Sequence, residues 1–328
     1  MKLFEKNTKA LEFDKVLEKL AEFTSCEDAR ENALNLRPES SLAMAQALLN
    51  QTADAHMLFG GPSFGGLKNV NNALSRANAG SVLNTRELLD IAGVLRVIRT
   101  LSQWRESNTG VHSVLDPLFN ALAPNKYLET AIFNAIVSED EISDNASPAL
   151  ADIRRKIRVQ ESKVREQLEK FTRSQTNSKF LQENIITQRN GRYVVPVKNE
   201  YRSEIAGLVH DTSSSGATVF IEPMAVVEAN NEIRVLQAKE REEIERILYE
   251  LSVQAGDFAQ SIKNSYECAL ELNLIFAKAQ YAYKIKAMPP ILNDSGIINL
   301  RAARHPLIDP KKVVPVDIML GKDFDTLV

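Results

Sequence analysis

The chain has 328 residues, of which 44% are hydrophobic and 25% are charged, and its net charge at pH 7 is −3. This length predicts about two domains, and the balance of 40 basic against 43 acidic residues excludes a uniformly basic nucleic-acid coat protein and a disordered acidic chain. Few glycines, prolines and aromatic residues argue against an all-β sandwich or propeller and favour long helices.

Cysteine content and hydropathy predict the compartment. Only Cys26 and Cys268 are present, which is too few for a disulfide framework and indicates reducing surroundings. The first six residues carry charges where a signal peptide would be apolar, and no run reaches the roughly 18 apolar residues that a membrane helix needs. We therefore expect a cytoplasmic protein with no membrane partner.

Residues 1–145 have the pattern of a helical core domain. Apolar residues at helical spacing share one face near the start, namely Phe13, Val16, Leu17 and Leu20. Asn84 followed by Glu87 resembles a capping box that opens a later helix. Glycine and proline breakers separate these segments, so an all-α domain of about six helices is expected.

Two long stretches then lack the residues that break helices. Residues 149–190 contain neither glycine nor proline, and residues 224–288 contain no proline and only Gly256. Ser147 and Pro148 are a start signal for the first helix. Each stretch has one apolar stripe, Ile153, Ile157, Val164, Leu168 and Phe171 in the first and Ile233, Leu236, Ile244, Ile247, Leu251, Ala255 and Phe258 in the second. This predicts an antiparallel coiled-coil lever with arms at 146–184 and 223–288, each reaching roughly 50 Å.

Between the arms the pattern becomes alternating. Strand-like runs on both sides of Asn190-Gly191 predict a β-hairpin, and further strands are expected at 205–210 and 218–221 around a serine-rich loop. Pro196 suggests an edge strand. Residues 185–222 are therefore predicted to form a small β clamp at the tip of the lever.

The last segment, residues 289–328, changes character again. Strand-like runs are expected at 297–300, 313–320 and 324–328, and the chain stops inside the last of them. We expect these to be the first strands of a larger α/β domain that is truncated here. The predicted fold class is mainly α: a helical core, a coiled-coil lever with a β clamp, and the start of an α/β domain.

Catalytic and metal chemistry find little support in the sequence. Residues 61–66 have the glycine spacing of a phosphate loop, but Leu67 stands where lysine is required. No histidine has a second ligand at metal-binding spacing. His210 and Asp211 next to the serines superficially suggest a triad, but adjacent side chains on a strand point to opposite faces. We expect no catalytic site and no metal site.

Charge is distributed unevenly. Residues 151–198 carry 12 basic and five acidic residues, which gives +7 there and −10 elsewhere. The basic residues of the first arm are interpreted as pairing with Glu240, Glu242, Glu243 and Glu245 of the second arm. At the tip few acids are expected nearby, so basic and hydroxyl groups there are candidate nucleic-acid contacts: Arg189, Arg192, Lys198, Arg202, His210, Ser213, Ser214, Ser215 and Thr218.

Several motifs together resemble the type-two bacterial MutS family over the whole chain. They are Ile186-Thr187-x-Arg189-Asn190-Gly191-Arg192-Tyr193-Val194-Val195-Pro196-Val197-Lys198, Val209-His210-Asp211, Ser213-x-Ser215-Gly216-x-Thr218-x-Phe220-Ile221-Glu222-Pro223, Ala303-Arg304-His305-Pro306-Leu307-Ile308 and Asp323-Phe324-Asp325-Thr326-Leu327-Val328. The opening Leu11-Glu12-Phe13-Asp14-Lys15-Val16 fits the family's start.

The resemblance implies a core, lever and clamp followed by a dimerising ABC-type ATPase domain and a small nuclease domain. ATP and Mg²⁺ are then cofactors of the full-length protein, and this chain alone would hydrolyse no ATP. His305 is implied to border the nucleotide pocket. Two targets remain open, branched or junction DNA in the suppression of recombination and the ribosome in the splitting of collided ribosomes. A coiled-coil interaction module is the third reading.

Overall fold

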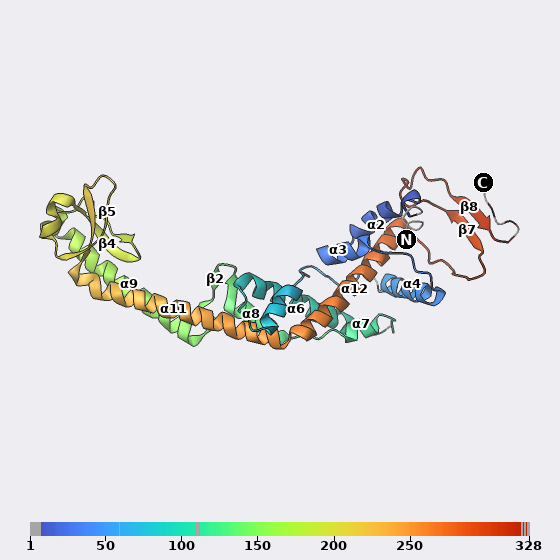
Figure 1. Cartoon of the computed structure of the whole chain (residues 1–328), viewed down its shortest axis with the longest axis horizontal. Coiled ribbons are helices and arrows are strands. Elements are labelled where there is room, and N and C mark those ends of the chain that lie inside the picture. The colour runs from blue at the N-terminus through green and yellow to red at the C-terminus, as the bar shows by residue number, and fades with distance from the viewer. Residues whose placement is uncertain are drawn as a thin grey trace. The chain divides into compact units, whose positions relative to one another are not determined.

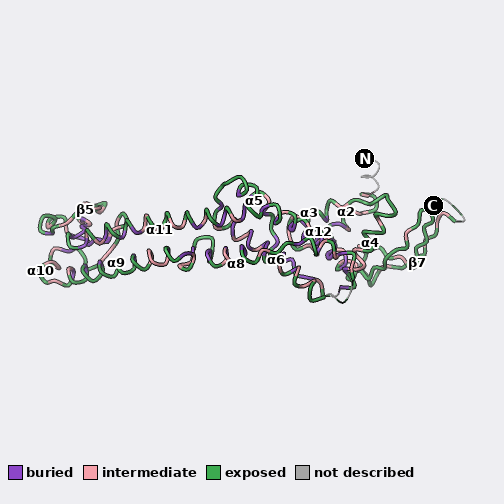
Figure 2. Tube along the Cα trace, turned by 90° about the horizontal axis from the view of Figure 1, so that it is seen from below, coloured by how far each residue is buried: buried purple, intermediate pink, exposed green. Residues whose placement is uncertain are grey.

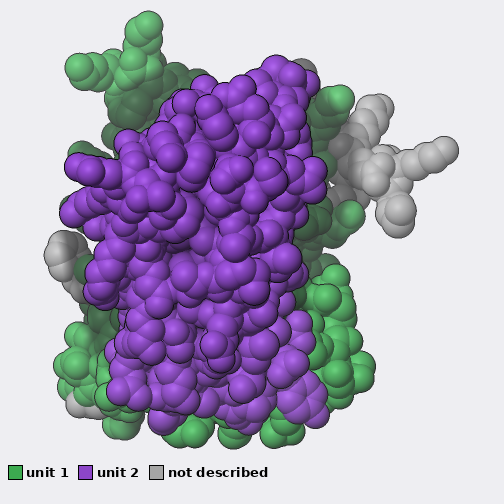
Figure 3. All heavy atoms as spheres, turned by 90° about the vertical axis from the view of Figure 1, so that its left-hand side faces the viewer, with its two compact units in different colours: residues 1–132, 252–328 green, residues 133–251 purple. Residues whose placement is uncertain are grey.

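The computed structural model describes residues 8–58, 60–108, 110, 112–322, 324 and 326 (Figure 1). Helices dominate the described residues and the sheets are small and antiparallel, so the prediction of a mainly α protein is confirmed. The chain divides into two compact units, residues 1–132 with 252–328 (unit 1) and residues 133–251 (unit 2), which Figure 3 colours separately. None of the described helices combines the length and the apolar character of a membrane span.

Unit 1 is built from helices and one late hairpin. In chain order its helices are α2 (Phe13–Ala21), α3 (Glu27–Leu34), α4 (Leu42–Met57), α5 (Asn71–Asn78), α6 (Thr85–Glu106), α7 (Asp116–Asn120), α8 (Lys126–Ala135, which runs into unit 2) and α12 (Ala259–Ile285). The described part of the N-terminal segment therefore holds at least seven helices, where about six were expected. Strands β7 (Ile298–Ala303) and β8 (Val316–Leu320) pair antiparallel.

The interior of unit 1 forms around α6 and α12. The predicted capping box is present, because Asn84 accepts from the Glu87 N–H and the Glu87 carboxylate accepts from the Asn84 N–H. One face of α6 is fully buried. Trp104 packs on Phe119 and Phe276 with ring centroids 5.8 Å apart in both pairs. This core brings together side chains of α6, α7 and α12, which are distant in sequence.

The segment with phosphate-loop spacing is a connection between helices. Residues 60–66 follow α4 and precede α5, and no strand lies among the described residues around them. Leu67 is buried, and Lys68 pairs with Asp90 at 2.5 Å. The rejection of a Walker-type loop agrees with this geometry.

The second long stretch is two helices instead of one. Helix α11 (Met224–Asp257) ends one residue after Gly256, and α12 begins at Ala259. A Cβ on Gly256 would lie 2.8 Å from the carbonyl oxygen of Ala77, so only glycine permits this approach. The continuous arm expected to residue 288 is therefore wrong, and Phe258, predicted in its apolar stripe, is 45% exposed.

Unit 2 contains the sheet and two long helices. Its elements are β1 (Ile136–Ser138), β2 (Glu141–Ile142), η1 (Asp144–Ala146), α9 (Pro148–Arg173), α10 (Gln175–Ser178), β3 (Thr187–Arg189), β4 (Arg192–Lys198), η2 (Asn199–Glu204), β5 (Gly207–Thr212), β6 (Thr218–Pro223) and most of α11. The expected start of the first long helix is confirmed, since Ser147 caps it and Pro148 follows. The helix ends at Arg173, before the predicted limit of 184.

Helices α9 and α11 lie side by side and antiparallel (Figures 1 and 2). Ser147 before α9 donates to Glu243 late in α11 over 2.6 Å, whereas Leu168 near the end of α9 shares a buried cluster with Ile233 early in α11. Arg246 and Ser147 both bond the Glu243 carboxylate and lower its pKa to about 2. The predicted coiled coil stays a prediction, while the antiparallel pairing of the two helices is observed.

The four-stranded sheet has the order β3-β4-β6-β5. Asn190 and Gly191 have φ values of 53° and 74°, as a two-residue hairpin turn with a primed geometry requires, so the hairpin prediction is confirmed. The edge position expected from Pro196 is wrong, because β4 lies inside the sheet. Proline is tolerated at this position because the side of residue 196 that lacks an N–H faces away from β6. It faces Leu181 and Gln182, where only one isolated bridge forms.

Predictions about the last residues are tested only in part. β7 and β8 match the first two expected strand-like runs. For the third run, residues 323, 325, 327 and 328 lie outside the described part of the chain. The domain limits proposed from the sequence stay predictions.

Candidate nucleic-acid interface

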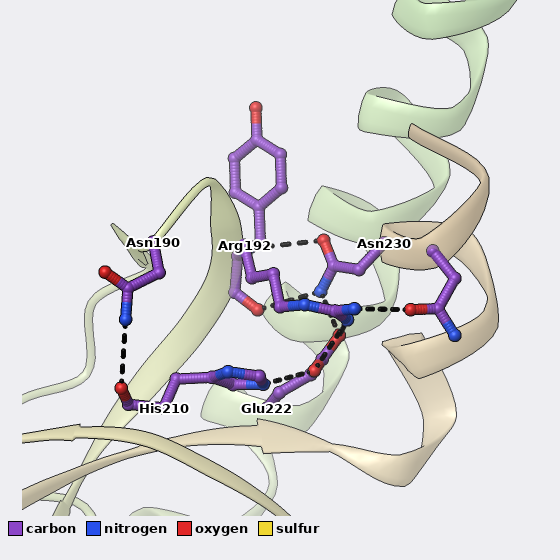
Figure 4. Close-up of polar contacts among 7 residues, drawn as sticks. Asn190, Arg192, His210, Glu222 and Asn230 are labelled. Atoms are coloured by element: carbon purple, nitrogen blue, oxygen red, sulfur yellow. Dashed lines mark hydrogen bonds and ion pairs between the residues drawn. The ribbon is translucent and has the colours of Figure 1, made fainter. Parts of the chain in front are cut away.

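A buried carboxylate organises one end of the β3–β6 sheet. Glu222, at the end of β6, has 0% of its side chain exposed and receives bonds from three elements (Figure 4). Arg192 of β4 donates through Nη1 to both carboxylate oxygens at 2.8 and 3.0 Å. His210 of β5 reaches the second oxygen through Nε2 at 2.5 Å, and Asn230 of α11 donates to the first at 2.8 Å. We call these four residues the Glu222 network.

The network also ties the helix to the strand backbone. Asn230 accepts from the Tyr193 N–H over 3.2 Å and donates back to the Tyr193 carbonyl over 3.1 Å. Arg192 donates through Nη2 to Asn231. Asn190 in the hairpin turn donates to the His210 carbonyl at 3.2 Å, which joins the turn to β5 (Figure 4). A buried charge is tolerated only when it is paired and hydrogen-bonded, and Glu222 meets both conditions.

This geometry changes the reading of Arg192 and His210. Their side chains are only 13% and 17% exposed, and their nitrogens face Glu222. The expectation that few acids lie near the tip cations is therefore wrong for Arg192. Glu222 lies 30 residues after Arg192 and just beyond the strand predicted at 218–221, and strand pairing brings the two together.

Arg189 is also engaged within the sheet. Its guanidinium lies 4.0 Å from the centroid of the Phe220 ring, and its Nε is 3.3 Å from the Asp211 carboxylate. His210, at the irregularity between Val209 and Asp211 in β5, bonds Glu222, whereas Asp211 pairs with Arg189. No triad geometry joins them to the described serines.

The opposite end of the sheet gathers another group of predicted residues. Lys198 at the end of β4 is in register with Thr218 at the start of β6, and the Asn199 N–H donates to the Ala217 carbonyl over 3.0 Å. The loop between β5 and β6, residues 213–217, therefore lies beside Lys198, and we call it the serine loop. Its hydroxyls serve the turn in part, since Ser213 Oγ accepts from the Thr218 N–H at 3.1 Å.

The remaining loop serines stay accessible. Ser214 and Ser215 are exposed, and Gly216 takes a φ of 71° to close the loop. The Gly216 N–H donates to the Ser213 carbonyl at 2.8 Å. Arg202, on η2, is exposed as well. The nine predicted contact residues are therefore split between two ends of the sheet, with Arg192 and His210 at the Glu222 end.

Two lysines and two aromatic rings form a cluster that the sequence reading did not assemble. Lys179 Nζ lies 4.8 Å from the centroid of the Phe180 ring, and Lys198 Nζ lies 5.9 Å from that of Tyr201. The two rings are 5.2 Å apart, and Lys198 donates to the Lys179 carbonyl at 3.3 Å. We call these residues the basic–aromatic cluster. The pairs Lys179-Phe180 and Lys198-x-x-Tyr201 are visible in the sequence, but only the fold places them together.

The interpreted pairing of the basic side chains of α9 with α11 is observed only in part among the described residues. Among the described residues of these arms, the ion pair that joins the two helices is Arg154–Glu240, with Nε and Oε1 2.7 Å apart. Several others bond acids on their own helix or in η1. The outward side chains are exposed, and they are Arg155, Lys156, Arg158, Lys163, Arg165, Lys170 and Arg173. The solvated-face interpretation holds, and Glu240 is confirmed as a partner, whereas the other ion pairs of these cations lie within α9 or reach η1.

His305 lies in unit 1, at an open pocket of about 480 Å³. Its Nδ1 accepts from the Leu307 N–H at 3.3 Å, and Glu12 and Lys15 line the same pocket. A nucleotide-bordering role for His305 stays a prediction. Among the described residues, no three potential metal ligands cluster.

Comparison with known proteins identifies the family. The chain is 44% identical over 99% of its length to Endonuclease MutS2 of Ruminiclostridium cellulolyticum. It is 43% identical, again over 99%, to the proteins of that name from Acetivibrio thermocellus and Caldanaerobacter subterraneus subsp. tengcongensis. Over nearly its whole length the chain is thus homologous to part of proteins of the type-two bacterial MutS family. The resemblance of its motifs to that family is confirmed.

The match covers only part of each relative. The chain spans 42% of the length of the first two relatives and 41% of the third. No protein-family model matches the chain. Activities of the longer MutS2 proteins therefore reach this chain only as proposals.

Proposed function

We propose that unit 2 of this MutS2-related chain binds the backbone of branched or junction DNA, with the end of the sheet that carries the basic–aromatic cluster. The observation that carries the proposal is this cluster, where Lys179 and Lys198 meet Phe180 and Tyr201 next to the serine loop. Cations that track phosphates beside aromatic rings are the usual chemistry of nucleic-acid grooves.

Charge and hydroxyl groups support this assignment. Phosphate contacts come from lysine, arginine and serine side chains and from backbone N–H groups, and they position a protein without reading sequence. Lys198 and Arg202 offer charge, while Ser214 and Ser215 offer exposed hydroxyls on the adjoining loop. Arg189 and Arg192 are left out of the proposed contact set because Asp211 and Glu222 already neutralise them.

A charge-reversal experiment tests the proposal. The triple variant Lys179→Glu, Lys198→Glu, Arg202→Glu is expected to weaken binding to a labelled four-way DNA junction by at least about 30-fold, since repulsion replaces attraction at each position. Fluorescence anisotropy at fixed ionic strength measures the dissociation constant.

The matched control carries the same charge change on another surface of unit 2. Arg234→Glu, Lys239→Glu, Arg241→Glu alters three exposed residues of α11 and is expected to change the affinity by less than about threefold. Equal losses in the two variants would contradict the assignment of the site. If the wild-type chain bound no DNA junction, the proposal would fail and the chain would be interpreted as a coiled-coil interaction module.

In the longer family members we propose that this DNA binding serves the suppression of recombination. ATP and Mg²⁺ would be bound there by segments other than the phosphate-loop-like residues 61–66. Dimerisation of the full-length protein belongs to the same proposal. The alternative target is the ribosome, since ribosomal RNA offers the same phosphates. Competition of 70S ribosomes against the labelled junction separates the two targets.

A further inference from the structure

Next to the basic–aromatic cluster lies a pocket that the predicted contact set does not use. Its volume is about 590 Å³, and it opens between the end of α9, the short helix α10 and the segment before β3. Thr172 and Arg173 contribute from α9, Gln175 and Ser178 from α10, and Asn184 with Ile185 from the third segment. All of these residues belong to unit 2.

Two amides in this pocket are free. Neither the Gln175 nor the Asn184 side chain makes a hydrogen bond to any described residue, and both residues are exposed. By contrast, the hydroxyls of Thr172 and Ser178 bond the carbonyls of Glu169 and Gln175 at 3.2 and 3.5 Å. The pocket therefore holds two unpaired groups that each offer one donor side and one acceptor side.

The remaining walls of the pocket offer an apolar surface for the face of a planar ligand and a cation beside its edge. Ile185 is 49% exposed and supplies an apolar surface. Arg173 is 81% exposed at the rim, and its contact with Glu169 at 3.3 Å is a surface pair of small energy, which leaves the guanidinium able to move onto another anion. Amides that match adjacent donors and acceptors, with an apolar wall and a cation beside them, are how proteins hold a nucleobase and its phosphate.

Position in the chain connects this pocket to the proposed interface. Lys179 and Phe180 follow directly after α10, whose Gln175 and Ser178 line the pocket. A nucleic-acid strand bound by the cluster therefore lies close to the mouth of the pocket, because the cluster and the pocket are formed by neighbouring residues. A paired base has its hydrogen-bonding edge covered and its faces stacked, so only an extruded base can enter.

We propose that this pocket binds an unpaired nucleobase, extruded from a bulge or a branch point, through Gln175 and Asn184. The proposal rests on nucleic-acid binding by unit 2 and specifies what that site prefers. Base recognition adds affinity for DNA with an unpaired base, while the phosphate contacts at the cluster are shared by all DNA.

Three labelled duplexes of equal length test the proposal: a perfect duplex, one with a single-adenine bulge, and one with an abasic bulge at the same place. We expect the adenine bulge to bind at least about fivefold more tightly than the perfect duplex, the gain that one amide–base pair provides. The abasic bulge is expected to bind like the perfect duplex, since it bends equally but offers no base.

The variant Gln175→Ala, Asn184→Ala is expected to bind the perfect duplex within about twofold of wild type and to lose the preference for the adenine bulge. Gln167→Ala, an exposed glutamine of α9 outside the pocket, serves as the control and should keep the preference. A preference that is absent from wild type, shared by the abasic bulge or retained in the double variant would overturn the pocket assignment. Failure to bind any duplex would instead overturn the proposed function.

Discussion

At the scale of single residues, Glu222 joins three elements of unit 2. Its carboxylate is bonded by Arg192, His210 and Asn230, which come from two strands and a helix. Glu222 stands in the run Phe220-Ile221-Glu222-Pro223, and nothing in the spacing of that run predicts that Arg192 and His210 will face it. The partner depends on strand pairing between β4 and β6.

The exchange Glu222→Gln is expected to destabilise unit 2 by about 3 kcal/mol, because it leaves the mostly buried Arg192 without a counter-charge. Hydrogen exchange measured by mass spectrometry should show faster exchange in β4 and β6. Asp211→Asn, which removes the exposed partner of Arg189, is the control and should cost less than about 1 kcal/mol. If both variants exchanged alike, the Glu222 network would have no special role.

At the scale of elements, the sequence predicted which segments are helical better than where they end. The absence of glycine and proline predicted the long helices, and Ser147 with Pro148 predicted the start of α9. The ends depended on contacts elsewhere. The second stretch breaks one residue after Gly256, which lies against the carbonyl of Ala77 in α5, 179 residues earlier in the chain.

Two helical glycines of unit 1 provide a matched test of that explanation. Gly256→Ala is expected to destabilise unit 1 by about 1–3 kcal/mol, since the new methyl meets the Ala77 carbonyl at 2.8 Å. Gly93→Ala in α6 meets its nearest neighbour at an ordinary 3.7 Å and is expected to stabilise by about 0.5–1 kcal/mol. Urea unfolding followed by Trp104 fluorescence reports on unit 1. Shifts of the same sign would count against the packing explanation.

At the scale of the whole molecule, net charge is a poor guide to binding. The chain carries −3 overall, yet unit 2 exposes a basic face on α9 and three accessible cations around the basic–aromatic cluster. Interactions between exposed charges fade within about 8–10 Å at physiological salt, so a ligand responds to the local surface. Sequence arithmetic located the basic region, but the structure decided which cations are accessible.

The salt dependence of DNA binding counts those cations. If Lys179, Lys198 and Arg202 alone neutralise phosphates, a plot of log K against log salt concentration should have a slope of about −3. The charge-reversal variant of these residues should flatten it, and the α11 control should not. A slope of about −7 or steeper in wild type would show that the exposed cations of α9 also contact DNA, and would enlarge the proposed interface.

The sequence by itself determined the mainly α fold, the Asn190-Gly191 hairpin and the family, because these depend on local spacing and on short motifs. Tertiary structure decided the function of individual side chains. Of the nine predicted contact residues, Arg192 and His210 went to a buried carboxylate, while Lys198 joined Lys179 and two rings. Strand register and helix packing set these neighbours, and both join residues that lie far apart along the chain.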